Sequence, residues 1–427
     1  MLISILYRIF QFILILLGIY WLKGASSSPA VTWMSIYVIE DFNYFSWTDI
    51  YTFLLQNKLP LPPVIAFIEL AAYKIFGSTY LVTIFLYKVA FIAPYMIVLS
   101  FAQTSLRRLI IVFLISCLFL YCSITIHRGN PQGYDVFLPL LIILFIQAVS
   151  QSLHSQLALS RIKHAIWAGC CLSLAELTRP FMIYLLPLLM GAVWLRYLIC
   201  DQNIRFKLIA GFLMPIILIS GSLHLCLYIN HQQINFSNHA GFNLHRAWSR
   251  LVPLPPLVAE PTLPDANPDR GENFNTKEHQ INSQRIQNAI FSHWATHPIQ
   301  STSFALSLVR DFMSAPTAIY KHNPTSIFLE TYRLLYQLLS ALLIINFLIM
   351  FTRITFFSKT KIYDLTETDN LILLIGTCLI VIFAISEKAE EARFVISTLP
   401  FVAAVALARS EDQFTEKRCS QQIRYIW

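Results

Sequence analysis

The chain has 427 residues, of which 56% are hydrophobic and only 13% charged, with a net charge of +8 and a mean hydropathy of +0.59. Soluble proteins carry about twice that share of charged residues, and disordered chains hold far fewer apolar ones. The composition excludes both classes and predicts an all-α integral membrane protein, because helices satisfy their own backbone hydrogen bonds in lipid.

Ten apolar segments are long enough for transmembrane helices, which need roughly 20 mostly apolar residues. We expect them at residues 3–22, 80–103, 109–126, 134–152, 164–178, 180–199, 207–228, 331–352, 370–386 and 394–409. The first lacks a cleavage site of small residues and is interpreted as a retained signal anchor. The "LTRP" motif at Leu177–Pro180 leaves open whether the fifth and sixth segments are two spans or one broken element.

The distribution of Lys and Arg orients these segments. Basic residues cluster in the short connections on one side, such as those with Arg107–Arg108 and Arg205–Lys207, which predicts that this side is cytoplasmic. Both termini are then cytoplasmic, and we expect a multi-pass protein of the inner (plasma) membrane. Topology explains the positive charge, so the expected partner is the bilayer and not a nucleic acid.

Two longer segments fall on the outer side. Residues 23–79 are expected to form an acidic outer loop with two amphipathic interfacial helices, at Thr48–Asn57 and Pro62–Phe76. Residues 229–330 are expected to form a large outer, periplasmic loop that is Pro-rich at first and helical in its second half. The predicted domains are a seven-span module (1–228), this large loop (229–330), a three-span module (331–409) and a cytoplasmic tail (410–427).

Charged side chains at or within the apolar segments are candidates for a functional site, because charge is costly in lipid. They are Glu40, Asp41, Asp135, Glu176, Arg179 and Arg393 on the outer side, and Lys88 inside the second segment. A solvated loop, a helix cap, a structural ion pair and snorkelling to the headgroups are the alternatives for the outer residues. Together, carboxylates and cations on one face of the membrane indicate chemistry on a phosphorylated lipid.

Short motifs in a fixed order connect these residues. They are "EDFNY" (Glu40–Tyr44), "LPPVIAFIELAAYKIFGS" (Leu61–Ser78), Asp135 at the head of the fourth segment, "LAELTRP" (Leu174–Pro180), "HAGFNLHRAW" (His239–Trp248), "ATHPIQSTSFALSLVRDF" (Ala295–Phe312) and "EEARFVISTLPFVAAVALA" (Glu390–Ala408). The series resembles the C-type glycosyltransferase superfamily, especially its protein O-mannosyltransferase and aminoarabinose-transferase branch. It departs from that pattern in the order of the two acids, in Leu61 where a His is common, and in Arg179 where a Lys is common.

The resemblance implies a hexosyl- or pentosyltransferase that moves a sugar from a polyprenyl-phosphate donor to an acceptor hydroxyl on the outer face. The acceptor is left open among a lipid, a glycan and a protein. No cofactor follows with certainty, and no ligand set supports a divalent metal. With the resemblance, the candidate residues are Asp41 or Glu40 as the base, Asp135 as an orienting residue, and Arg393 and Arg179 for the donor phosphate. Their own charge and position add Lys88 as a further candidate for the phosphate, and His127, Arg128 and Tyr44 are accessory candidates.

Three other functions fit parts of the pattern. An O-antigen polymerase or ligase also acts on polyprenyl-linked sugars and has a large outer loop, while a lipid-linked-sugar flippase is polytopic as well. The flippase is disfavoured because transporters tend to place charges at mid-bilayer and to show internal repeats. A non-catalytic scaffold with the same fold is the third alternative.

Overall fold

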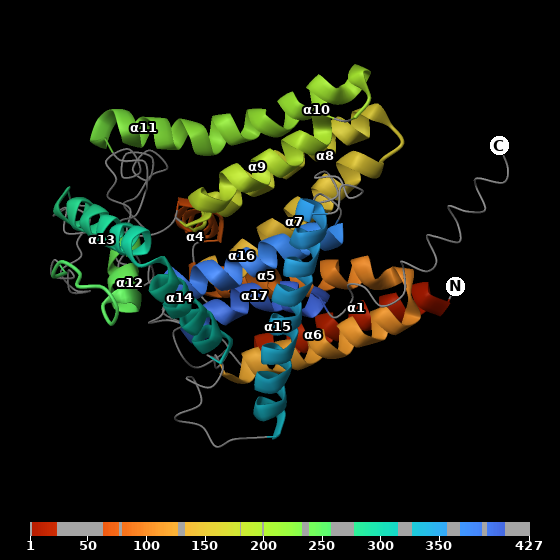
Figure 1. Cartoon of the computed structure of the whole chain (residues 1–427). Helices are drawn as coiled ribbons and strands as arrows, with labels where there is room; N and C mark the ends of the chain where they lie inside the picture. The colour runs from red at the N-terminus through yellow and green to blue at the C-terminus, as the bar shows by residue number, and fades with distance from the viewer. Residues whose placement is uncertain are drawn as a thin grey trace.

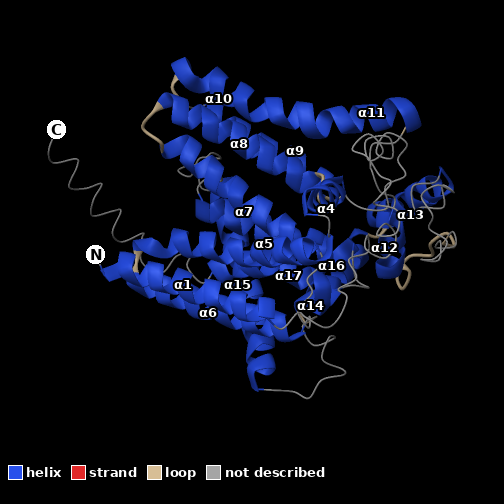
Figure 2. Cartoon of the chain, turned by 180° about the vertical axis from the view of Figure 1, so that it is seen from behind, coloured by secondary structure: helices blue, strands red, loops and turns tan. Residues whose placement is uncertain are grey.

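The structure, a computed structural model, describes residues 2–23, 63–76, 79–126, 133–179, 181–198, 200–232, 239–257, 277–314, 327–356, 368–386 and 391–405. Within these ranges every regular element is a helix and there is no strand (Figure 2). The predicted all-α class is confirmed. Glu40, Asp41, Tyr44, His127, Arg128 and the expected helix at Thr48–Asn57 lie outside the described residues.

A helix lies at each of the ten expected segments. They are α1 (Leu2–Lys23), α5 (Thr79–Phe101), α6 (Leu106–Ile126), α7 (Gly133–His154), α8 (Ala158–Glu176), α9 (Met182–Leu198), α10 (Gln202–Pro215) continued by the π-helix η2 (Ile216–Gly221) and α11 (Ser222–His231), α15 (Ile327–Phe356), α16 (Thr368–Ser386) and α17 (Glu391–Val405). The break around Arg179 therefore separates two helices, α8 and α9.

Four helical segments are long and apolar enough to cross a membrane. They are Val136–His154, Gln202–His231, Glu330–Thr352 and Asp369–Ser386. Shorter apolar helices cover Leu2–Leu17, Lys88–Phe101 and Met182–Leu198. The protein is thus a helical membrane protein, while the count of ten spans stays a prediction.

The helices form a bundle with a second layer beside it. In Figure 1, α5, α7, α16 and α17 lie together with α1 and α6, and α8 to α11 form the neighbouring layer. Helix α17 is central, because its apolar side chains, such as Leu399 and Phe401, are fully buried among those of the surrounding helices. The start of α1 and the loop helices α12 (His239–Trp248) and α13 (Lys277–Thr296) lie at opposite ends in both views.

We call the two ends of the bundle the turn end and the loop end. The turn end contains the connection at residues 155–157 and Cys200, and the loop end contains Glu176, Phe181 and Ile385. At the turn end Arg161 Nε donates a hydrogen bond of 2.9 Å to Ser152 O, one of the carbonyls that a helix C-terminus leaves without a partner.

Close backbone contact fixes α8 against α10. A Cβ atom added at Gly169 would lie only 2.2 Å from the carbonyl oxygen of Phe212. Small residues let membrane helices approach in this way, so the glycine sets the distance between the two helices. That distance in turn places η2 and α11 beside the second half of α8.

The loop helices α12, α13 and α14 (Pro298–Met313) have a small core of their own around Trp248, Ile286, Ile290 and Leu308. Helices α13 and α14 lie in the second half of the segment 229–330. Trp248 Nε1 donates a hydrogen bond of 3.0 Å to Ile385 O at the end of α16. The loop helices are thereby attached directly to the bundle.

Candidate functional site

A buried carboxylate marks the loop end of α8. Glu176 is the last residue of this helix, and its side chain is fully buried. It accepts a hydrogen bond of 2.6 Å from Ser220 Oγ, and its other oxygen lies 2.9 Å from His224 Nε2. Both carboxylate oxygens therefore have polar partners, as a buried charge requires.

The two partners come from the π-helical segment and the helix after it. Ser220 belongs to η2, which follows Pro215, and His224 lies in the first turn of α11. Residues four apart share one face of a helix, so both side chains reach α8 together. π-Helical turns are rare and frequently occur at functional sites.

This arrangement gives His224 a defined orientation. Its side chain is 13% exposed, whereas that of Glu176 is 0% exposed. When the imidazole is neutral, the Nε2–H points to the carboxylate and Nδ1 carries the lone pair; this tautomer is assigned from the hydrogen bond. A carboxylate that holds an imidazole in one tautomer is the arrangement used for general-base catalysis.

Arg179 lies directly beyond the buried carboxylate. It is 8% exposed, and its backbone N–H donates to Glu176 O over 3.1 Å in the turn that ends the helix. A guanidinium is always charged and can bind a phosphate through two parallel hydrogen bonds. The end of α8 therefore carries a carboxylate and a guanidinium three residues apart, and α11 adds the imidazole of His224 next to the carboxylate.

Aromatic contacts join this end to α16 and α14. The ring of Phe181 packs edge-to-face on that of Phe383, with centroids 4.9 Å apart, and Phe383 stacks on Phe312 at 6.3 Å. Phe383 lies near the end of α16, and Phe312 near the end of α14. The ends of three helices that are distant in sequence thus meet beside Arg179.

Helix α4 (Pro63–Phe76) also packs against this end of α8. Val64 packs against the buried pair Leu177 and Leu227, which stand next to the Glu176–His224 contact. The predicted amphipathic segment at Pro62–Phe76 is a helix. Its first turn, which contains Val64, lies at the loop end.

Chain direction places two more predicted residues at the same end. Helices α7 and α8 have 22 and 19 residues and are joined by a tight turn, so the first turn of α7, with Asp135, is level with the last turn of α8. Arg393 lies in the first turn of α17, directly after α16 ends at Ser386. Only the backbone positions of Asp135 and Arg393 are described, and both fall at the loop end.

Lys88 is placed differently. It lies in the middle of α5 and is 1% exposed, roughly 13 Å along the axis from Thr79 at 1.5 Å per residue. It is therefore not grouped with Arg179 at a helix end. Its predicted role in binding the donor phosphate stays a prediction.

Sequence reasoning identified Glu176 and Arg179 but missed Ser220 and His224. The signal was present, because a His inside the apolar segment 207–228 is as unusual in lipid as a carboxylate. Among the described residues there is no group of three or more His, Cys, Asp or Glu that could hold a metal ion.

Comparison of the chain with protein-family models, with curated proteins and with solved structures finds no match.

Proposed function

We propose that this protein is a membrane glycosyltransferase that moves a sugar from a polyprenyl-phosphate donor to an acceptor hydroxyl at the loop end. One observation carries the proposal: helices distant in sequence bring buried Glu176 and Arg179, and the first turns that contain Asp135 and Arg393, to one end of the bundle. Titratable and cationic groups that gather at one end of a membrane bundle are typical of a functional site.

The proposed mechanism is a single displacement. A carboxylate, Asp41 or its neighbour Glu40, removes the proton of the acceptor hydroxyl as that oxygen attacks the anomeric carbon, and Asp135 orients donor or acceptor. The lipid phosphate leaves with the bonding electrons. Arg179 and Arg393 neutralise its growing negative charge, which is where electrostatic stabilisation lowers the barrier.

The Glu176–His224 contact has a supporting part in this scheme. His224 supplies an imidazole at the loop end, and Glu176 fixes its ring and partners its charge when it is protonated. The scheme places the loop end on the outer face, with ten spans and both termini in the cytoplasm. An activated sugar must arrive there on a lipid, because no pool of nucleotide sugars exists outside the cell.

The test is transfer from defined donors. Membranes that contain the protein are incubated with a panel of radiolabelled polyprenyl-phosphate sugars, and the label is followed into lipid, glycan and protein fractions. We expect one donor to be used, and Asp41→Asn to abolish transfer while expression and membrane insertion are unchanged.

Two outcomes would remove the proposed chemistry. Full transfer by both Asp41→Asn and Glu40→Gln would exclude the proposed base. Movement of the intact labelled lipid across the bilayer without any transfer would identify a flippase instead.

A further inference from the structure

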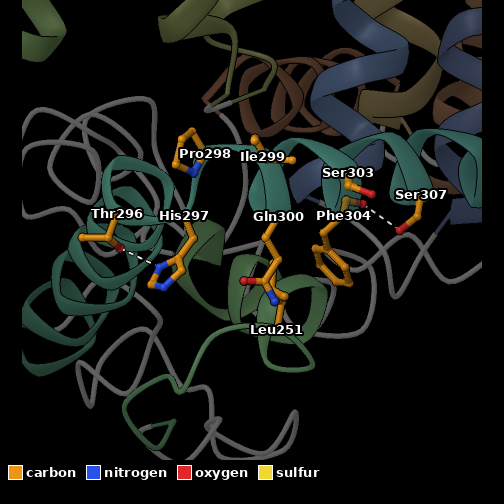
Figure 3. Close-up of a pocket in the computed structure, with 9 residues that line it drawn as sticks. All are labelled: Leu251, Thr296, His297, Pro298, Ile299, Gln300, Ser303, Phe304 and Ser307. Atoms are coloured by element: carbon orange, nitrogen blue, oxygen red, sulfur yellow. Dashed lines mark hydrogen bonds between the residues drawn. The ribbon is translucent and has the colours of Figure 1, made fainter.

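The loop helices carry an open groove at the corner between α13 and α14 (Figure 3). Its volume is about 750 Å³, within the range of roughly 300–1,000 Å³ that is usual for small-molecule sites. It is lined by Leu251, Thr296, His297, Pro298, Ile299, Gln300, Ser303, Phe304 and Ser307. The groove is separate from the Glu176–His224 contact.

One helical face supplies the groove's main polar and aromatic groups. Gln300 and Phe304 are four residues apart and share one face of α14, while His297 is the residue that immediately precedes this helix. In Figure 3 these three side chains extend toward the side on which Leu251 lies. A ligand in the groove would meet an imidazole, a primary amide and a phenyl ring together.

The side chains of Phe304 and His297 pack against neighbouring rings. The ring of Phe304 packs on that of Trp248 with centroids 5.3 Å apart, and Trp248 is 2% exposed and also contacts Trp294. The His297 ring stacks on that of His293 at 4.8 Å, and its Nδ1 lies 2.8 Å from Thr296 Oγ1. A preorganised site loses less entropy when a ligand binds.

The chemistry of the lining selects the ligand class. None of the nine described residues that line the groove is Lys, Arg, Asp or Glu, so this described part of the lining provides no permanent counter-charge for a phosphate, a carboxylate or a cation. It provides an amide, which offers donors and an acceptor at once, and hydroxyl groups. The negative face of an aromatic ring attracts the C–H groups of a sugar ring.

We propose that this groove binds a neutral saccharide. One part of this proposal rests on the proposed function: if the protein is a glycosyltransferase, the groove identifies its acceptor as a glycan. The hydrogen bond between Trp248 and Ile385 attaches the helices of the groove to the loop end. The binding of the saccharide itself is independent of any transfer reaction.

Binding is tested on the full chain in lipid nanodiscs, without sugar-based detergents that would compete. Saturation-transfer NMR is recorded with mannotriose and with N,N′-diacetylchitobiose, both neutral, and with a Ser/Thr-containing peptide. We expect a saturable signal from a saccharide. Gln300→Ala should weaken its affinity about fivefold, the effect of one hydrogen bond of about 1 kcal/mol.

Matched variants separate the groove from the rest of the surface. Gln284→Ala removes the same amide from an exposed position on α13 and should leave binding unchanged. Ser303→Trp fills the groove and should abolish binding, whereas Thr302→Trp, on an exposed position of α14 outside the lining, should not. A signal from the peptide alone, or equal binding by Gln300→Ala and Gln284→Ala, would overturn the proposal.

The two proposals fail in different ways. If the protein binds a saccharide, Ser303→Trp abolishes that binding, and none of the donors is used, the saccharide site is supported and the proposed glycosyltransferase activity is contradicted. If the wild-type chain transfers sugar from a donor but binds no saccharide in the NMR experiment, the saccharide site is contradicted and the proposed enzyme activity is supported.

Discussion

The two ends of helix α8 use polar side chains for different purposes. At the turn end Arg161 donates to Ser152 O and, over 3.4 Å, to Cys200 Sγ, while Arg205 donates to Cys200 O. The acceptors are mostly backbone carbonyls at the C-terminal ends of neighbouring helices. At the loop end the partners of Glu176 are two side chains, and the carboxylate is fully buried.

The difference concerns exposure and the kind of partner at each end. A partly exposed Arg at a helix C-terminus offsets the negative end of the helix dipole, and water can replace it at small cost. A buried carboxylate and its partner gain little stability over apolar side chains of the same size, because both must lose their hydration. We therefore expect the buried contact at the loop end to contribute less to stability than to the proposed reaction.

Among the changes that test this comparison of the two ends of α8, the largest effect is expected at Glu176. Glu176→Gln keeps the shape of the side chain but removes the charge that orients His224, so we expect transfer to fall about 100-fold, the lower range for loss of acid–base catalysis. The rate is measured with the donor identified in the radiolabel assay, at equal amounts of inserted protein. A rate equal to that of the wild type would assign the contact to structure alone.

An intermediate effect is expected between the two ends, at Gly169. Gly169→Ala would force the backbones of α8 and α10 apart, because the new Cβ atom meets Phe212 O. We expect a loss of about 1–3 kcal/mol in stability, the range for overpacking, seen as a lower melting temperature in detergent.

Gly191 is the control for this change. A Cβ atom added at Gly191 meets no atom within 4 Å, so Gly191→Ala should leave the melting temperature unchanged or raise it slightly. If both variants melted at the same temperature, close contact at Gly169 would not position η2 and α11.

The smallest expected effect is at the turn end. Arg161→Gln removes a side chain–backbone hydrogen bond that water can replace, so we expect a loss below about 1 kcal/mol and an unchanged rate of transfer. Thermal unfolding and the transfer assay are run beside Glu176→Gln. A loss of transfer as large as in that variant would contradict the difference between the two ends.

The positions of the helices could be predicted because they depend on local composition. An apolar run of sufficient length must become a helix in lipid, and each of the ten expected ranges contains one. Glu176 and Arg179 could be selected for the same reason, since charge near lipid is unusual wherever it occurs. The break between α8 and α9 also follows from the sequence, because Pro180 disfavours a continuous helix.

The partners of Glu176 could not be predicted in this way. Ser220 and His224 reach it through the packing of α8 on α10, which depends on contacts between segments far apart in the sequence. The contact of Val64 with Leu177 and Leu227 is equally non-local. The groove at α13 and α14 depends on how two loop helices meet, and neither helix shows it alone.

The six-residue segment Ile216–Gly221 determines which residues of the following helix face α8. A wide turn accommodates one residue more than an ordinary one, and each residue of an α-helix advances the side-chain direction by about 100°. If this segment contained one residue fewer, α11 would be rotated by more than a quarter of a turn about its axis. The imidazole of His224 would then no longer face the carboxylate of Glu176. The backbone winding of this segment therefore determines whether the imidazole faces the carboxylate.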